Sequence, residues 1–188
     1  MEPFSREALS LIRGSLKAQS KGRDLALLSV GVDSMLRCGD LLSLRVRDVR
    51  GHDGVIRDRF PVQQEKTGSV VMVTLTTKTQ AALSELITTE SKWSDDYLFT
   101  AGGDPHGKAV SEVMLRRLVK DWARIAHLDP KHYSGHSLRR TKAVFIYRET
   151  HNAEAVRQLL GHGSLAHTIA YLGVRQDEVS DLARAFDI

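Results

Sequence analysis

Apolar residues recur with helical spacing over the first fifty positions of the chain. Ser5 can cap a first helix, and Lys21-Gly22 ends it. The apolar residues on one face of this helix are Leu9, Ile12 and Leu16. The pattern predicts a second helix over residues 23–32 and a short helical segment over residues 40–44.

The pattern then changes from helical spacing to alternation. Asp53-Gly54 and Thr67-Gly68-Ser69 are turn signals, and the segments near them are rich in β-branched residues. Pro61 separates two of these segments. We therefore expect a small three-stranded antiparallel sheet, with strands over residues 55–60, 62–65 and 70–75.

Helical spacing returns after this sheet in several separate segments, with a loop over residues 94–105. Within that loop, residues 97–99 are expected to form a brief buried strand, and His132–Gly135 is a second loop. The tail carries apolar residues with i, i+3, i+4, i+7 spacing at Val179, Leu182, Ala183 and Phe186. The predicted helices cover residues 77–88, 110–126, 137–149 and 153–160, followed by the tail helix. The expected fold class is mainly α with a small three-stranded antiparallel β-sheet (α+β).

Composition places the chain among soluble globular proteins. It has 188 residues, of which 41% are apolar and 27% charged. Its apolar runs are short, and its first residues lack the basic start and apolar run of a signal peptide, so no membrane association is expected. The single cysteine, Cys38, excludes an internal disulfide and fits a cytoplasmic setting.

Basic charge is concentrated in one part of the chain. The net charge is +4, yet residues 108–148 contain ten Lys or Arg against three Asp or Glu, an excess of seven. Such a stretch suits a polyanionic partner, although a solvated helix face explains it equally well.

Two motifs in the C-terminal half contain groups suited to phosphate chemistry. His136 and Arg139 are three residues apart at a predicted helix start, so they face the same way. A guanidinium binds two phosphate oxygens, while an imidazole can donate or move a proton near neutral pH. His162 follows the end of a helix, and Tyr171 lies among apolar neighbours further on. Taken singly, each residue is better explained as a surface or core residue.

Two further candidates lie in the N-terminal half. Arg37 precedes Asp40 by three residues, so a carboxylate is available to hold the guanidinium. Lys66 falls at the tip of a predicted hairpin, from which it can reach a DNA groove. A structural ion pair and a solvated turn lysine are the ordinary explanations of these two features.

The order of these groups resembles the tyrosine recombinase family, also called phage integrases. An Arg, a Lys at a β-turn, an H-x-x-R motif, a Leu-Gly-His motif and a Tyr nine residues after that His follow one another. The resemblance covers nearly the whole chain. Around Arg37 the family's usual sequence is Gly-Leu-Arg-x-x-Glu-Leu, and here Met35 and Asp40 replace the Gly and the Glu.

The resemblance implies the catalytic-domain fold of that family and a role for each residue. Tyr171 would attack the scissile phosphate and form a 3′-phosphotyrosine. Arg37 and Arg139 would hold the non-bridging oxygens. His136 and His162 would hydrogen-bond the phosphate, and His136 would also help to remove the tyrosine proton.

The resemblance further implies that Lys66 protonates the departing 5′-oxygen. Elementary chemistry is consistent with these roles, because phosphoryl transfer depends mainly on positioning and charge stabilisation. A phenol with a pKa of about 10 needs a base or nearby positive charge to become a good nucleophile. Two Arg and two His can supply that field, so neither a metal nor a cofactor is expected, and no G-x-x-x-x-G-K-[ST] motif is present.

Three other functions fit parts of this sequence. A metal hydrolase is disfavoured because no Cys/His cluster has zinc spacing. A non-catalytic DNA-binding regulator on the same fold would need the basic surface but no intact nucleophile, so the presence of all six residues disfavours it. A type IB topoisomerase shares the chemistry and would relax supercoiled DNA without strand exchange.

The resemblance also bears on domains and partners. We expect residues 1–188 to form a single catalytic domain, with the N-terminal core-binding domain of most family members absent. The chain would then be either truncated or one of the short members, like the fimbrial phase-variation recombinases. Double-stranded DNA is the expected partner. The tail helix would dock into a neighbouring protomer and give a homo-tetramer on DNA.

Overall fold

The computed structural model describes residues 1–173, so the predicted tail helix lies outside the described residues. Helices predominate, as expected, and a two-stranded sheet follows the fourth helix. The elements are α1 (Arg6–Ala18), α2 (Gly22–Ser34), α3 (Cys38–Ser43), α4 (Val46–Val49), β1 (Arg59–Gln63), β2 (Val70–Thr74), α5 (Thr77–Thr89), α6 (Glu112–Ile125), a 3₁₀ turn (Pro130–His132), α7 (Gly135–Thr150), α8 (Ala153–Leu160) and α9 (Leu165–Leu172).

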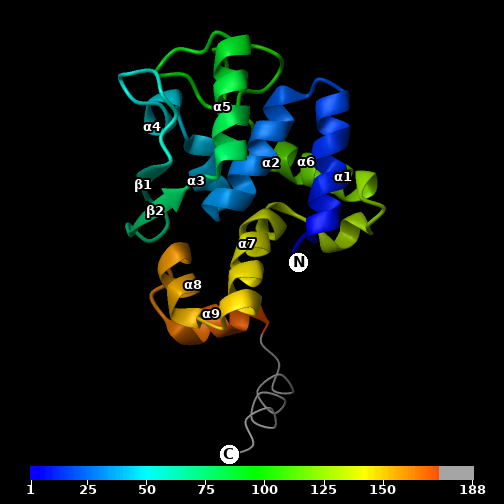
Figure 1. Ribbon diagram of the computed structural model, residues 1–188, viewed down its shortest axis with the longest axis vertical. Coiled ribbons are helices and arrows are strands. Elements are labelled where there is room, and N and C mark those ends of the chain that lie inside the picture. Colours follow the sequence, from blue (N-terminus) through cyan, green and yellow to red (C-terminus); the bar gives the residue numbers. More distant parts are fainter. Residues whose placement is uncertain (174–188) are drawn as a thin grey trace, which may run out of the picture.

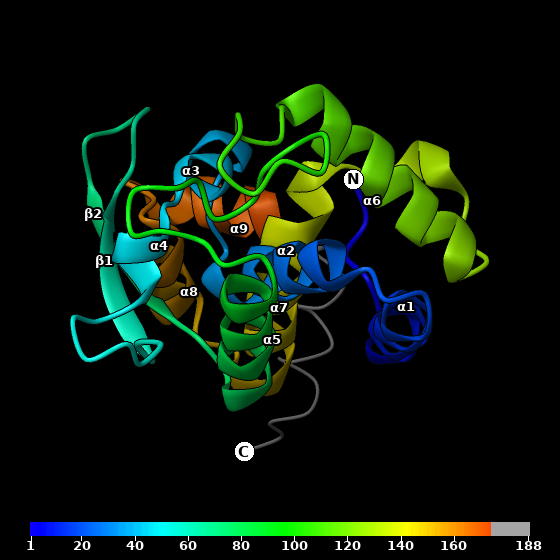
Figure 2. The ribbon, with the colours of Figure 1, turned by 90° about the horizontal axis from the view of Figure 1, so that it is seen from above.

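Most apolar side chains meet in one main core. Helices α1, α2, α5 and α6 enclose it together with the start of α7 and the inner face of the hairpin. Figure 2 shows the hairpin at one end of the molecule and α1 and α6 at the other, with α2 and α7 between them. The largest fully buried side chains include Trp122, Phe60 and Phe99. Each such burial contributes about 1.5–3 kcal/mol. No helix within residues 1–173 has the length and apolar character to cross a membrane.

A second, smaller cluster holds the C-terminal helices. Its buried members are Met35, Ala143, Val144, Val156, Leu160 and Leu172. Helices α8 and α9 pack here against the C-terminal part of α7, below the rest of the molecule in Figure 1. We call these six residues the second cluster. Because α7 contributes to both cores, it connects them.

Side-chain caps set where the helices begin. Ser5 accepts a hydrogen bond from the Ala8 amide at 3.1 Å, so the predicted cap of α1 is confirmed. At α7, Ser134 and Ser137 form a reciprocal capping box. This box begins α7 at Gly135, two residues before the predicted start, so His136 stands in the first helical turn.

The predicted three-stranded sheet is wrong, because the structure contains a two-stranded antiparallel hairpin. Its register pairs Phe60 with Val73 and Val62 with Val71, and Pro61 lies within β1 rather than between two strands. Ladder bonds at Gln64–Ser69 and Asp58–Leu75 make the residues of even number in β1 the hydrogen-bonding ones. Proline at position 61 therefore removes no donor from the ladder, and the strand continues through it.

Residues 97–99 do not form the predicted strand. Leu98 and Phe99 are fully buried, as expected, but the neighbouring pairings Arg45–Tyr97 and Thr100–Ala109 are isolated bridges. Apolar character alone does not separate an extended buried loop from a strand, because strand formation needs a partner of matching length.

Candidate active site

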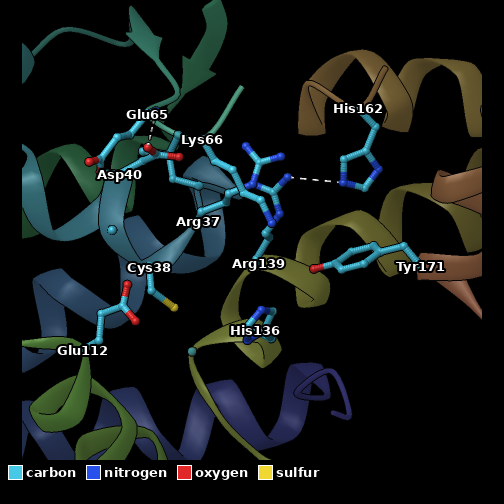
Figure 3. Close-up of a pocket in the computed structure, with 13 residues that line it drawn as sticks. Arg37, Cys38, Asp40, Glu65, Lys66, Glu112, His136, Arg139, His162 and Tyr171 are labelled. Carbon is cyan, nitrogen blue, oxygen red and sulfur yellow. Dashed lines mark hydrogen bonds between the residues drawn. The ribbon is translucent and has the colours of Figure 1, made fainter. Parts of the chain in front are cut away.

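One cleft of about 750 Å³ collects all six sequence-predicted residues. It lies between α3, the hairpin turn, the start of α7 and the α8–α9 region (Figure 3). The predicted residues that line it are Arg37, Lys66, His136, Arg139, His162 and Tyr171. They come from segments as far apart in sequence as α3 and α9, so folding creates this constellation.

Arg139 is the central and most enclosed of these groups. It is 4% exposed, and its Nη1 donates to the Met35 carbonyl at 2.5 Å. Its Nη2 donates to the Leu160 carbonyl at 2.8 Å. Burial lowers the pKa of Arg139, but a guanidinium remains charged at neutral pH. Two backbone acceptors at the ends of α2 and α8 thus hold a buried cation in one orientation.

A left-handed turn directs Arg37 into the same cleft. Met35 ends α2 with φ +52°, the conformation for which the family's usual residue, glycine, is suited. Arg37 is half-buried, and its Nη1 donates to Oε1 of Gln64. Figure 3 shows the guanidinium groups of Arg37 and Arg139 meeting at the centre of the cleft.

Asp40 does not form the contact with Arg37 that the spacing of the two residues made available. Asp40 is buried, and its Oδ1 accepts the backbone N–H of Glu65 at 2.9 Å instead (Figure 3). Aspartate is one methylene shorter than glutamate, and here it meets the turn of the β1–β2 hairpin. The hydrogen bond from the Glu65 N–H to Asp40 anchors the turn that carries Lys66. The Lys66 side chain is exposed at the border of the cleft.

Tyr171 projects from α9 toward Arg139. Its hydroxyl is buried and has no hydrogen-bond partner among residues 1–173. Burial raises the pKa of Tyr171, while the charges of Arg139 and Arg140 oppose that rise. A buried hydroxyl without a partner is costly, and an incoming ligand atom can relieve that cost.

Arg140 holds the end of the helix that carries Tyr171, a role that the sequence did not reveal. Its Nη2 donates to the Leu172 carbonyl at 3.1 Å, and its Nη1 to the Met1 carbonyl at 2.8 Å. Gly173 follows with φ +70°, and a Cβ there would come within 2.7 Å of Arg140 Nη2. Glycine therefore permits this close approach at the C-terminus of α9.

His162 is neutral in this site. Burial, then the charges of Arg139 and Arg37, lower its pKa to about 4. Its Nδ1 lies 3.1 Å from the Thr168 hydroxyl, which itself donates to the Ser164 carbonyl. The hydroxyl must then accept from Nδ1–H, which leaves the Nε2 lone pair facing Arg139 Nη2 at 3.4 Å. The ring is edge-on to Tyr171, with 5.4 Å between centroids.

His136 and three further side chains complete the lining. His136 is exposed in the first turn of α7. Glu65, Glu112 and Cys38 also border the cleft, and the sequence alone gave no signal for them. Burial and the charge of Glu112 raise the pKa of Cys38, which keeps it a neutral thiol.

The arrangement is suited to an anion. Arg37, Arg139 and Lys66 make no ion pair with any carboxylate in the described part of the chain. Only one donor atom of Arg37 is engaged there, so its remaining N–H groups are available for two oxygens. A phosphodiester fits such a site, with a buried phenol beside it.

Proteins of one family resemble this chain over most of its length. Residues 5–178 match the phage integrase family. The probable integrase/recombinase YoeC of Bacillus subtilis is 24% identical over 97% of this chain and 94% of its own length. A tyrosine recombinase of Pseudothermotoga lettingae is 30% identical over 93% of this chain and 57% of its own. Tyrosine recombinase XerC of Oceanobacillus iheyensis is 27% identical over 85% and 52%.

Solved structures show the same fold. XerA recombinase superposes with a TM-score of 0.77 at 21% identity, covering 98% of this chain and 65% of that one. XerH site-specific recombinase bound to its difH substrate gives 0.75 at 20% identity, covering 97% and 54%. The chain thus spans just over half of several of these relatives. On its family match over residues 5–178, this chain belongs to the phage integrase family of tyrosine recombinases.

Proposed function

We propose that this chain is the catalytic part of a site-specific DNA recombinase that breaks and rejoins strands through a phosphotyrosine. One observation carries the proposal: within the described residues, two guanidinium groups that form no ion pair and a buried tyrosine hydroxyl without a hydrogen-bond partner meet in one cleft. Cations bind the phosphodiester, and the phenol supplies a nucleophile that stays attached to it.

The two arginines stabilise the charge of the reacting phosphate. Arg37 uses its free N–H groups, and Arg139 adds a fixed positive charge in a buried environment where electrostatic interactions are strong. Neither forms an ion pair with a carboxylate of residues 1–173, so we expect both charges to act on the non-bridging oxygens. Tyr171 oxygen forms a bond to phosphorus as the bond from phosphorus to the 5′-oxygen breaks.

Proton transfers accompany both bond changes. The resemblance gave the phenol proton to His136, but that side chain is exposed. His162 presents an Nε2 lone pair and lies edge-on to Tyr171, so we assign the phenol proton to His162 instead. The bound phosphate raises the pKa of His162 by its negative charge and makes it a better base. His136 hydrogen-bonds a phosphate oxygen from the mouth of the cleft. Lys66 gives a proton to the departing 5′-oxygen.

A basic groove continues from the cleft and offers a path for the DNA backbone. It shares Cys38, Glu112, Gly135 and His136 with the cleft, and its basic residues are Arg116, Lys120 and Lys131. Arg116 and Lys120 are four residues apart on α6, so they project from one face. The two hollows together support double-stranded DNA as the partner.

Assembly on DNA is part of the same proposal. The tail carries apolar residues at helical spacing, including Val179 and Phe186. We propose that it docks into a neighbouring protomer and holds a tetramer on DNA. Deletion of residues 178–188 should abolish cooperative assembly in gel-shift titrations while monomer binding remains. Cooperative assembly by the shortened chain would contradict this part.

Covalent trapping tests the catalytic function. Nicked suicide DNA substrates, whose cleaved end diffuses away, should accumulate a covalent protein–DNA adduct. Tyr171→Phe removes one oxygen and should eliminate the adduct while leaving the fold and DNA binding unchanged. Tyr147→Phe is the matched control and should behave like the parent chain.

Three outcomes would redirect the assignment. Binding without any adduct would favour the non-catalytic regulator. An adduct mapped to Tyr97, Tyr133 or Tyr147 would show that another tyrosine is the nucleophile. Relaxation of supercoiled DNA without strand exchange would favour topoisomerase activity.

A further inference from the structure

Gln64 lies between the hairpin and the C-terminus of α8 and is 0% exposed. Its side-chain amide makes three contacts with different parts of the site. Oε1 accepts from Arg37 Nη1 and from the Thr67 hydroxyl, the latter at 3.2 Å, and Nε2 donates to the Leu160 carbonyl at 3.1 Å. One neutral side chain thus joins an arginine, the hairpin turn and a helix terminus.

The Leu160 carbonyl extends this connection to the second arginine. It accepts both from Gln64 Nε2 at 3.1 Å and from Arg139 Nη2 at 2.8 Å. His162 follows two residues later. Gly161, with φ +65°, permits the close packing, since a Cβ there would lie 3.0 Å from Gln64 Oε1 and 2.5 Å from Val71. Arg37 and Arg139 are therefore linked through one amide and one carbonyl.

The chemistry of the amide is matched to these neighbours. Its oxygen faces a cation and its nitrogen faces a carbonyl, so both ends are satisfied in one orientation. A carboxylate here would also orient Arg37, but it would neutralise the charge that a phosphate needs and would face the Leu160 carbonyl without a donor. An apolar side chain would leave both partners unpaired.

We propose that Gln64 is a positioning residue for phosphate binding: it fixes the orientation of Arg37 without neutralising it and couples Arg37 to Arg139 through the Leu160 carbonyl. This inference rests on the proposed function. It predicts that an isosteric carboxylate is harmful at position 64, although it preserves a partner for Arg37.

Single-turnover cleavage of suicide DNA tests the coupling by a double-mutant cycle. Gln64→Leu should slow adduct formation about 10–100-fold, the rate equivalent of one hydrogen bond to a charged group. In the Arg37→Ala background the same change should have less than about a threefold effect, because the partner is gone. Gln63→Leu, on the exposed neighbour, is the matched control and should leave the rate unchanged.

Gln64→Glu separates orientation from charge. It should also slow cleavage, and more so at low salt, where the new Arg37–Glu pair competes best with the phosphate. A bridging sulfur at the 5′ position should not restore the rate of Gln64→Leu, because the defect is not in leaving-group protonation. Additive losses in the cycle, full activity of Gln64→Glu, or rescue by sulfur would each overturn the proposal.

A measurement without cleavage keeps this inference separate from the proposed function. In side-chain NMR of the full chain, the Arg37 guanidinium should rotate slowly in the parent and in Gln63→Leu, and rapidly in Gln64→Leu. Unchanged rotation in Gln64→Leu would overturn the positioning role even if the parent is an active recombinase. Failure of the parent to form any adduct, with slow rotation intact, would instead contradict the proposed function.

Discussion

The two sides of the cleft are attached to cores of different size. Arg37, His136 and the Lys66 turn are held by segments that pack on the main core. His162 and Tyr171 are held by α8 and α9, which pack on the second cluster of six buried residues. The groups of the proposed active site are therefore divided between a large unit, to which we assign phosphate binding, and a small unit that carries the proposed nucleophile.

The difference in size has a consequence for dynamics. The free energy of local opening depends on the apolar area that an element buries, so α8 and α9 should open more readily than the helices of the main core. Arg139 and Gln64 connect the two units through the Leu160 carbonyl, and Arg140 connects them through Leu172. We therefore expect α8 and α9, with Tyr171, to open locally while the helices of the main core remain folded.

The largest predicted effect is on the phosphate-binding side. Lys66→Ala should slow cleavage of ordinary DNA by about 10²–10⁴-fold, because the 5′-alkoxide must then leave without a proton. A bridging 5′-sulfur should restore most of the rate, since a thiolate leaves unprotonated. Arg37→Ala, measured alongside, should not be rescued. If sulfur fails to restore Lys66→Ala, the lysine only binds DNA and His136 becomes the candidate acid.

Substitutions that create a cavity in the main core and in the second cluster should have different effects on DNA binding and cleavage. Trp122→Ala in the main core should lower the free energy of unfolding by about 3–5 kcal/mol and weaken DNA binding and cleavage together. Val156→Ala in the second cluster should cost about 1–3 kcal/mol. It should slow adduct formation while binding remains near the parent value. Denaturant titration combined with hydrogen exchange distinguishes the two variants. If Val156→Ala increased exchange equally in α8–α9 and in the main core, the two units would not open separately.

The basic groove should contribute affinity rather than rate. Arg116→Ala and Lys120→Ala should each reduce the slope of log affinity against log salt by about 1. Once DNA is saturating, cleavage should proceed at the parent rate. Arg117→Ala on another face of α6 is the matched control, and a similar loss of slope there would argue against the groove as the DNA path.

The smallest effect concerns the pH dependence of the nucleophile side. Because the pKa of His162 is lowered from 6.5 to about 4, the unfolded chain takes up this proton at a higher pH than the folded chain. The stability that neutral His162 contributes is complete above about pH 6.5 and is lost as the pH falls toward 4. The hydrogen-exchange rate relative to the intrinsic rate at the same pH should rise first for the amides of α8 and α9 over this range. His162→Gln should remove most of that rise; an unaltered profile would place its cause elsewhere.

Local patterns in the sequence determined much of this protein. Apolar spacing predicted most of the helices but not α4 or α9, Ser5 predicted the start of α1, and the order of six polar residues led to a family and a chemistry. These features depend on neighbours within a few positions, for which spacing and capping are sufficient guides. Dependence on near neighbours also explains why the third strand was wrongly predicted. Whether Pro61 interrupts a strand depends on whether its position in the ladder requires an N–H donor, and the pairing with β2 decides that.

Tertiary structure decided which groups act on which. The spacing of Arg37 and Asp40 suggested an ion pair between them. In the folded chain the Asp40 carboxylate instead accepts from the Glu65 backbone N–H, and the Arg37 guanidinium donates to Gln64. No sequence motif indicates the roles of Gln64 and Arg140, since the carbonyl groups that they contact, at helix ends, lie 96 and 32 residues away in sequence. A buried donor takes whichever acceptor the packed elements bring within reach, and only the assembled fold determines that choice.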